Sequence, residues 1–305
     1  MKIAFCFAGQ GSQYPKMGLD IYDKFDSAKK IYDQFPEIKD LCFNDETGKI
    51  NETKYAQKCM LLTSYVFAKM LEEKGITPEY ACGLSLGEYS ALAFADAWSL
   101  EDSIDIISHR GEIMQNALPL GTTKMAAVLG LEREAILEAI KNVKGICEIA
   151  NYNCPGQIVI TGDNEGIENA TAQLLLAKAK RVIELNVSGA FHSSLLTEAG
   201  YKLREVLNSK CHNMPKYKII YNISGKEENG ELNDILQKQI SNSVYFEDSI
   251  RYLMDQGVDT FVEIGPGKTL TGFIKKINRE ATVYTVTDLE SLNATIGGLL
   301  KWRLQ

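Results

Sequence analysis

The chain of 305 residues is predicted to fold as an α/β protein, with a large domain on a parallel sheet and a smaller domain inserted into it. Three observations support this prediction. Short apolar segments alternate with amphipathic ones, which is typical of parallel β/α layering. The order of the elements changes between residues 123 and 188. A serine flanked by glycines stands where an apolar run meets a helical segment, as at a sharp strand-to-helix turn.

The first part of the chain alternates strand and helix signals. Strands are predicted at 2–8 and 79–84, and helices at 19–34, 56–74, 86–96 and 101–117. Ser99 and Asp102 form a capping box that starts the last of these helices. The apolar N-terminal stretch is interpreted as a buried strand instead of a signal peptide, because it has one basic residue and no small-residue cleavage site.

The middle of the chain has a different order. Its predicted elements are a strand at 124–130, a helix at 132–143, strands at 146–151 and 157–162, a helix at 164–179 and a strand at 181–187. This β-α-β-β-α-β order is that of a ferredoxin-like unit. We therefore expect residues 123–188 to form the small domain and residues 1–122 and 189–305 the large one. A strand at 259–264, a Gly-Pro-Gly turn at 265–267 and a helix from 268 belong to the large domain.

Composition and charge argue against several classes of function. The net charge of −7 and the absence of any run of five basic residues argue against a nucleic-acid partner. No apolar run approaches the roughly 18–20 residues that a membrane span requires. The seven cysteines are scattered and lack CxxC spacing, which favours a reducing cytoplasm and no metal site.

The strongest local motif is Gly83-Leu84-Ser85-Leu86-Gly87, which follows an apolar run and precedes a helical segment. A Gly-x-Ser-x-Gly sequence at such a turn holds the serine on a tight backbone, and side chains at the glycine positions would clash. The Ser85 hydroxyl would then lie at a helix N-terminus, where negative charge is favoured. This pattern makes the large domain α/β-hydrolase-like. The alternative is a glycine-rich turn that packs a helix closely on a strand.

A serine nucleophile requires a base, and the chain has three histidines. His109 lies in the middle of a helix beside Arg110, and His212 lies in a polar Cys-His-Asn stretch. His192 follows the last strand of the small domain and precedes a helix. It is therefore the favoured partner of Ser85.

Seven motifs together resemble the malonyl-CoA:acyl-carrier-protein transacylase family, which includes acyltransferase domains of polyketide synthases. The resemblance covers nearly the full length. In order, the motifs are Gly9-Gln10-Gly11-Ser12-Gln13, residues 83–92 around Ser85, Arg110-Gly111 with Met114-Gln115, Met125-Ala126-Ala127-Val128, Asn153-Cys154-Pro155-Gly156-Gln157, Gly189-Ala190-Phe191-His192-Ser193 and Glu263-Ile264-Gly265-Pro266-Gly267.

The resemblance implies a role for each site residue. Ser85 would carry the acyl group as an ester and His192 would remove and return the proton. The backbone carbonyl of Gln239 would orient the histidine. The backbone N–H groups of Gln10 and Leu86 would form the oxyanion hole.

The resemblance also implies what the site binds. Arg110 matches the family arginine that holds the free carboxylate of the malonyl group, because a guanidinium can donate two parallel hydrogen bonds to it. The implied pocket residues are Gln57, Met114, Asn153 and Phe191. Gly189-Ala190-Phe191-His192 resembles the malonyl-selective form of the histidine motif. One departure is Leu84, which stands where the family usually has a histidine.

The partners implied are malonyl-CoA as substrate and an acyl carrier protein that brings its own phosphopantetheine, with no permanently bound cofactor. The expected state is a monomer, and the chain length favours fatty acid over polyketide synthesis. An acidic carrier protein would need a basic patch, for which the candidates are Lys178, Lys180, Arg181, Lys275, Lys276 and Arg279. Two other functions remain open: a serine hydrolase, which has no need of Arg110, and a non-catalytic scaffold.

Overall fold

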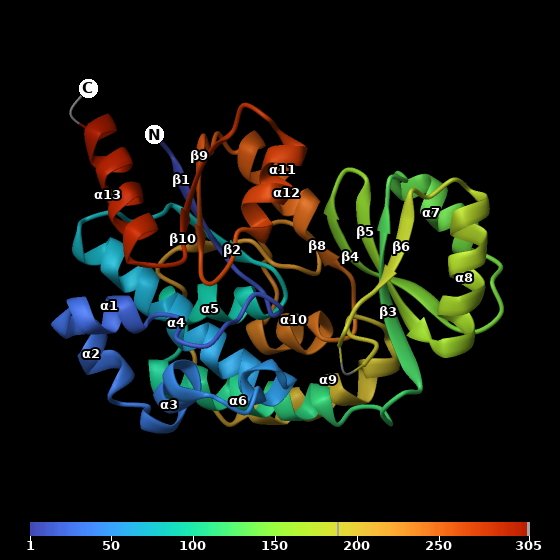
Figure 1. Ribbon diagram of the computed structural model, residues 1–305, viewed down its shortest axis with the longest axis horizontal. Helices are drawn as coiled ribbons and strands as arrows, with labels where there is room; N and C mark the ends of the chain where they lie inside the picture. The colour runs from blue at the N-terminus through green and yellow to red at the C-terminus, as the bar shows by residue number, and fades with distance from the viewer. Residues whose placement is uncertain (188, 304–305) are drawn as a thin grey trace.

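The computed structural model describes residues 1–187 and 189–303, and its core is two five-stranded sheets (Figure 1). The first sheet has the order β10-β9-β1-β2-β7. Its strands are β1 (Ile3–Phe7), β2 (Tyr80–Gly83), β7 (Lys218–Ile219), β9 (Thr260–Ile264) and β10 (Thr282–Val286). The second has the order β6-β3-β5-β4-β8. Its strands are β3 (Thr123–Leu129), β4 (Cys147–Cys154), β5 (Gln157–Asp163), β6 (Arg181–Glu184) and β8 (Val244–Tyr245).

The first sheet is entirely parallel, as the sequence predicts for the large domain. Its central strand β1 is buried along its whole length, which explains the continuous apolar run at the N-terminus. Strands β1 and β2 are neighbours, with Phe7 opposite Gly83 at their carboxyl ends. The segments that follow, Gly9-Gln10 and Leu84-Ser85, therefore emerge side by side at the edge where parallel sheets bind their ligands.

The helices of the first part pack around this sheet. They are α1 (Leu19–Lys24), α2 (Asp26–Tyr32), α3 (Pro36–Asn44), α4 (Thr53–Glu73), α5 (Leu86–Phe94) and α6 (Leu100–Gln115), with a short 3₁₀ helix at Lys49–Asn51. The single helix expected at 19–34 was wrong, because Phe25 is extended (φ −118°, ψ 124°) and separates α1 from α2. Helix α3 was not predicted. The predicted cap of α6 is confirmed, since the Ser99 hydroxyl accepts a hydrogen bond from the Asp102 N–H at 3.0 Å.

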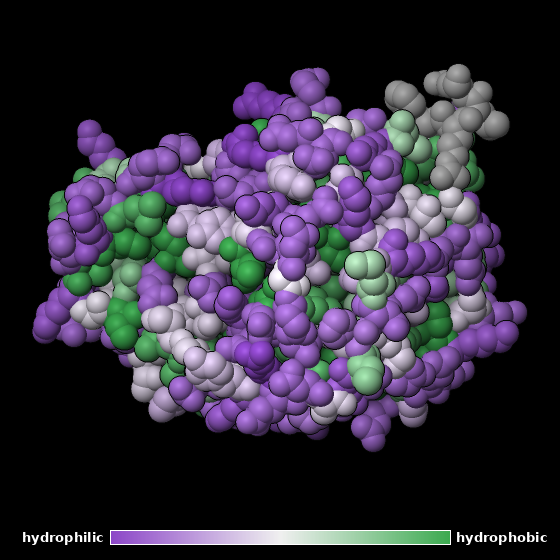
Figure 2. All heavy atoms as spheres, turned by 180° about the vertical axis from the view of Figure 1, so that it is seen from behind, coloured by the Kyte–Doolittle hydropathy of each residue, from purple (hydrophilic) through white to green (hydrophobic). Residues whose placement is uncertain are grey.

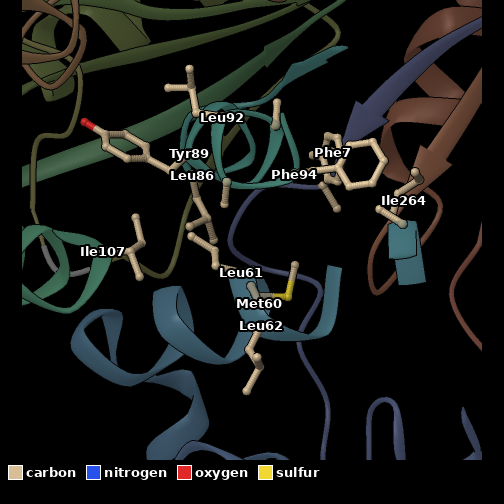
Figure 3. Close-up of a cluster of buried hydrophobic side chains, with 14 of the residues drawn as sticks. Phe7, Met60, Leu61, Leu62, Leu86, Tyr89, Leu92, Phe94, Ile107 and Ile264 are labelled. Carbon is tan, nitrogen blue, oxygen red and sulfur yellow. The ribbon is translucent and has the colours of Figure 1, made fainter. Parts of the chain in front are cut away.

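Helix α5, which carries the residues after Ser85, is buried on every side. Its Phe94 ring lies against Phe7 of β1, with ring centroids 5.9 Å apart. Figure 3 shows Phe94 of α5 beside Phe7 of β1, and Leu86 on the side of α5 that faces Met60 and Leu61 of α4. A helix enclosed in this way has little freedom to shift, so its N-terminus is a rigid support.

The second sheet has the strand order and antiparallel pairings of a ferredoxin-like unit among β3 to β6. Helices α7 (Arg133–Ile140) and α8 (Asn164–Leu176) cover its outer face (Figure 1). A fifth strand, β8, comes from outside residues 123–188 and pairs in parallel with β4. The boundaries at 122 and 189 remain a prediction, and Ser188 lies outside the described residues.

Side chains along β3 and β5 point alternately to the two faces of the second sheet, so each face can be identified by the residues it carries. Ala126, Val128 and Ile160 belong to the apolar cluster under α7 and α8. Their neighbours Ala127 and Val159 point to the opposite face and line a cavity. The inner face of this sheet is therefore turned toward the large domain.

The last third of the chain returns to the large domain through helices and short strands. Its helices are α9 (Thr197–Asn208), α10 (Leu232–Gln239), α11 (Phe246–Asp255), α12 (Thr269–Ile277) and α13 (Leu289–Arg303), with a 3₁₀ turn at Ser194–Leu196. In the face shown in Figure 2, hydrophilic side chains predominate and hydrophobic ones form scattered groups. None of the helices that the structure describes is long and apolar enough to cross a membrane.

Candidate active site

The turn between β2 and α5 holds Ser85 in a rare backbone conformation. Ser85 has φ 53° and ψ −102°, a combination that non-glycine residues seldom adopt. The flanking glycines are sterically required. A Cβ at Gly83 would lie 2.0 Å from the Gly87 carbonyl carbon, and one at Gly87 would lie 2.1 Å from the Phe7 carbonyl oxygen. This is the tight turn that the Gly-x-Ser-x-Gly motif predicts.

Ser85 and His192 meet across the chain. The Ser85 Oγ lies 2.7 Å from His192 Nε2, and His192 Nδ1 lies 2.9 Å from the backbone oxygen of Gln239. A carbonyl oxygen can only accept, so Nδ1 must carry the ring proton and Nε2 must accept from the serine hydroxyl. The structure thus places Ser85, His192 and the Gln239 carbonyl in the arrangement that the predicted roles require.

His192 is almost completely buried, with 3% of its surface exposed. Burial and the nearby Arg110 charge lower the pKa of the imidazole to about 4. The ring is therefore neutral at physiological pH, which leaves Nε2 free to take a proton. His109 and His212 are more exposed and contact Asp105 and Glu231 instead, so neither belongs to this site.

Arg110 is a fully buried cation whose partners are neutral oxygens. Its guanidinium donates to Gln57 Oε1 at 2.8 Å, to Gln239 Oε1 at 3.0 Å and to Ser85 Oγ at 3.2 Å. The ring of Tyr89 lies 4.8 Å away. Its Nε has no hydrogen-bond partner among the described residues. A buried positive charge held by hydroxyl and amide groups is well suited to an anionic ligand that arrives beside Ser85.

The predicted oxyanion-hole residues lie on the two loops that leave β1 and β2. A Cβ at Gly9 would lie 2.7 Å from the Leu84 carbonyl oxygen, so these loops touch. Gln10 and Leu86 both line the cavity around Ser85. Among the hydrogen bonds between described residues, neither backbone N–H finds an acceptor. Both groups are thus available for an oxygen that develops negative charge.

The cavity above Ser85 measures about 550 Å³ and lies between the two sheets. All four predicted pocket residues line it: Gln57, Met114, Asn153 and Phe191. The Gln57 amide connects Arg110 to Met114, whose sulfur it approaches at 3.4 Å. Asn153 is buried, and its Oδ1 has no hydrogen-bond partner in the part of the chain that the structure describes.

Comparison with known proteins decides the family. Residues 4–299 match the acyl transferase domain family. The malonyl CoA-acyl carrier protein transacylase of Bacillus subtilis is 40% identical over 97% of this chain and 96% of its own length. The crystal structure of the transacylase of that name from Clostridium perfringens matches with a TM-score of 0.97 at 38% identity, covering 100% of this chain and 99% of that one. This chain belongs to the malonyl CoA-acyl carrier protein transacylase family.

A second matching structure contains a malonyl-transacylase in complex with its type II polyketide synthase acyl-carrier protein, which is in the holo form. It matches with a TM-score of 0.94 at 32% identity and covers 98% of this chain and 100% of that one. As a member of the transacylase family, the present chain is an acyltransferase.

Three side chains near Ser85 in this transacylase were not predicted from the sequence. The Gln239 side chain bonds the Ser85 carbonyl oxygen at 2.8 Å as well as Arg110, whereas only the Gln239 backbone was expected to act. Asn222 bonds the Ser85 N–H at 2.7 Å. Glu88 is fully buried, and burial raises its pKa to about 8 although Asn222 N–H and Arg110 act against this. Glu88 stands in the serine motif, but no local pattern marks Asn222.

Proposed function

We propose that this protein transfers the malonyl group of malonyl-CoA to the phosphopantetheine thiol of an acyl carrier protein, through an ester on Ser85, for fatty acid biosynthesis. The observation that supports this proposal most directly is that the same Ser85 oxygen lies 2.7 Å from His192 Nε2 and 3.2 Å from the buried guanidinium of Arg110. A nucleophile beside a base suits acyl transfer, and a cation beside the nucleophile suits an acyl group that ends in a carboxylate. The names of the relatives agree with this substrate.

In the first half-reaction, His192 Nε2 takes the proton of the Ser85 hydroxyl as its oxygen attacks the thioester carbon. The backbone N–H groups of Gln10 and Leu86 stabilise the resulting oxyanion. The carbon–sulfur bond then breaks, and His192 returns the proton to the departing thiolate of coenzyme A. Arg110 holds the malonyl carboxylate throughout.

In the second half-reaction, the thiol of the carrier protein replaces coenzyme A in the same cavity. His192 takes the thiol proton as the sulfur attacks the ester carbon, and the proton passes to the Ser85 oxygen when the ester bond breaks. The first half-reaction breaks one carbon–sulfur bond and forms one carbon–oxygen bond, and the second does the reverse, so the two half-reactions balance without an oxidant or reductant.

Incubation with malonyl-CoA alone tests the proposal. We expect intact mass spectrometry to show one malonyl group per protein, with release of one equivalent of coenzyme A and no continuing turnover. The adduct should disappear in Ser85→Ala. It should persist in Ser90→Ala, which replaces a buried serine of α5, the helix that follows Ser85; the Ser90 hydroxyl has no hydrogen-bond partner among the described residues. Steady release of thiol without a carrier protein would instead indicate a hydrolase, and no adduct at all would indicate a scaffold.

We further propose that the carrier protein docks at a basic surface beside the cavity mouth. Each of the two basic segments of the sequence lies near the turn at Gly156-Gln157: Lys276 of α12 donates to Gln157 Oε1 at 3.0 Å, and Gln157 lines the cavity. On the other side, the Lys180 side chain packs over Gly130, whose N–H bonds Gly156 next to Gln157. Both lysines are exposed. Positive charge at this rim would attract an acidic carrier protein.

Charge reversal tests the docking surface. We expect Lys180→Glu combined with Lys276→Glu to raise the KM for the carrier protein roughly tenfold at low salt, because exposed charges contribute modestly each but steer together. The matched control is Lys24→Glu with Lys30→Glu, which changes net charge equally on the exposed surface of α1 and α2. Equal KM values for the two double variants would contradict the proposal.

We also propose that the protein acts in the cytoplasm as a monomer without a permanently bound cofactor. All seven cysteines are free thiols, and five are buried as small apolar groups, which suits a reducing compartment.

A further inference from the structure

Asn222 has a buried side chain that contacts the strained turn around Ser85. It has no part in the mechanism proposed above. It lies just after β7, with 1% of its surface exposed. Its amide spans the turn: Oδ1 accepts from the Ser85 N–H at 2.7 Å, and Nδ2 donates to the Gly83 carbonyl oxygen at 2.6 Å. One planar group therefore fixes peptide groups on both sides of Leu84.

These bonds act where the backbone needs support. A residue with φ 53° and ψ −102° is in a sparsely populated region, and such strain persists only when the surroundings determine it fully. The Ser85 N–H precedes α5 and is bonded to Asn222 alone among the described residues. The Ser85 carbonyl oxygen accepts from Gln239 Nε2 at 2.8 Å and from the Glu88 N–H at 3.1 Å. Asn222 thus completes the set of bonds that orients the serine.

The main chain of Asn222 is equally constrained. Its N–H donates to Glu88 Oε2 at 2.5 Å, and its carbonyl oxygen accepts from the Tyr245 N–H at 2.8 Å. Glu88 belongs to α5, whereas Tyr245 belongs to β8, which pairs with Tyr152 of β4. Asn222 therefore joins the turn that carries Ser85 to the sheet that lines the opposite wall of the cavity.

We propose that Asn222 is a positioning residue for acyl transfer, whose side-chain amide holds the turn so that the Ser85 hydroxyl points at His192. The proposal rests on the proposed function, in which Ser85 is the nucleophile. The amide supplies one acceptor and one donor at the required places. A carboxylate of the same shape supplies only acceptors, and its second oxygen would face the Gly83 carbonyl oxygen.

The experiment compares Asn222→Ala and Asn222→Asp in single-turnover acylation by malonyl-CoA. The yield of acyl-enzyme measures the fraction of correctly folded sites, and the rate constant of acylation depends on the geometry of those sites. We expect Asn222→Ala to retain a measurable yield and to lose about 100-fold in rate, the scale expected when a reacting group is misplaced by about 1 Å. Asn233→Ala is the matched control, because Asn233 is also buried but its side-chain amide bonds only Asn208 among the described residues, at 3.0 Å. It should keep the wild-type rate.

The pH profile separates positioning from simple support of the fold. In Asn222→Asp the protonated carboxyl can donate to the Gly83 oxygen as the amide does, whereas the ionised form repels it. The rate relative to wild type should therefore rise as pH falls, while that of Asn222→Ala stays constant. The titratable groups next to Asn222 include Glu88 on α5, Tyr221 beside it in the chain and Tyr245 on β8. Arg110 on α6 and His192 contact the same Ser85 hydroxyl, and all five groups are common to wild type and both variants.

Two results would overturn the proposal: a wild-type rate constant in Asn222→Ala, or a profile of Asn222→Asp that runs parallel to wild type at every pH. A lowered melting temperature with an unchanged rate per acylated site would assign Asn222 to stability alone, which also contradicts it. The Ser85→Ala variant distinguishes a failure of the proposed function from a failure of the Asn222 proposal. If that variant still forms an acyl-enzyme at the wild-type rate, the proposed function fails, whatever Asn222 does.

Discussion

Replacement of His192 by alanine is expected to slow acylation by malonyl-CoA by about 10³- to 10⁴-fold, the scale of a lost general base. The physical reason is the 2.7 Å contact between Ser85 Oγ and His192 Nε2, because the other side chain bonded to this hydroxyl among the described residues is the Arg110 guanidinium, which donates a hydrogen bond and cannot take the proton. Rapid-quench intact mass spectrometry would measure the rate. His109→Ala is the control, because this histidine lies on the outer face of α6 and should leave the rate unchanged.

The wild-type pH profile checks the same assignment. Burial and Arg110 lower the pKa of His192 to about 4, so the neutral form that accepts a proton is present above that pH and is lost below it. The value of kcat/KM for malonyl-CoA should therefore stay level from pH 8 to about 5 and fall only near pH 4. A midpoint near 6.5, the ordinary value for histidine, would contradict a buried neutral base.

Replacement of Arg110 by alanine is expected to reduce kcat/KM for malonyl-CoA by about 10³-fold, the scale of losing one partner of a buried ion pair. Acetyl-CoA has no carboxylate and should be affected far less, so the ratio of the two substrates should collapse. Arg110→Lys should recover little of the difference, because an ammonium group cannot reproduce bonds to Gln57 and Gln239 together with a bidentate contact to substrate.

The informative quantity for Arg110→Ala is the ratio of malonyl transfer to acetyl transfer. Arg204→Ala is the matched control, since Arg204 lies on α9 and pairs with Asp234 outside the cavity. Its ratio of malonyl to acetyl transfer should equal that of wild type. Equal losses for malonyl-CoA and acetyl-CoA in Arg110→Ala would show that Arg110 supports Ser85 without selecting the substrate, and the proposed malonyl specificity would then be wrong.

The local elements of this protein follow from the sequence because their causes are local. A whole apolar strand, a glycine on each side of Ser85 and the cap at Ser99 each act within a few residues, and all three are found in the structure. The pairing of Ser85 with His192 was predictable for another reason: only three histidines were available. The role proposed for Arg110 came from the family resemblance, since nothing in its own helix distinguishes it from an exposed arginine.

The contacts of Asn222, of β8 and of the Gln239 side chain were decided by the tertiary structure alone. Asn222 lies after a two-residue strand, and β8 is a two-residue strand added to a sheet formed elsewhere in the chain. Such short strands exist only because a neighbouring edge offers hydrogen bonds, so they have no sequence pattern of their own. The side-chain bonds from Asn222 and Gln239 to the Ser85 backbone depend on the same assembly. The sequence determined which chemical groups this protein has, and the packing of the two sheets decided which of them reach Ser85.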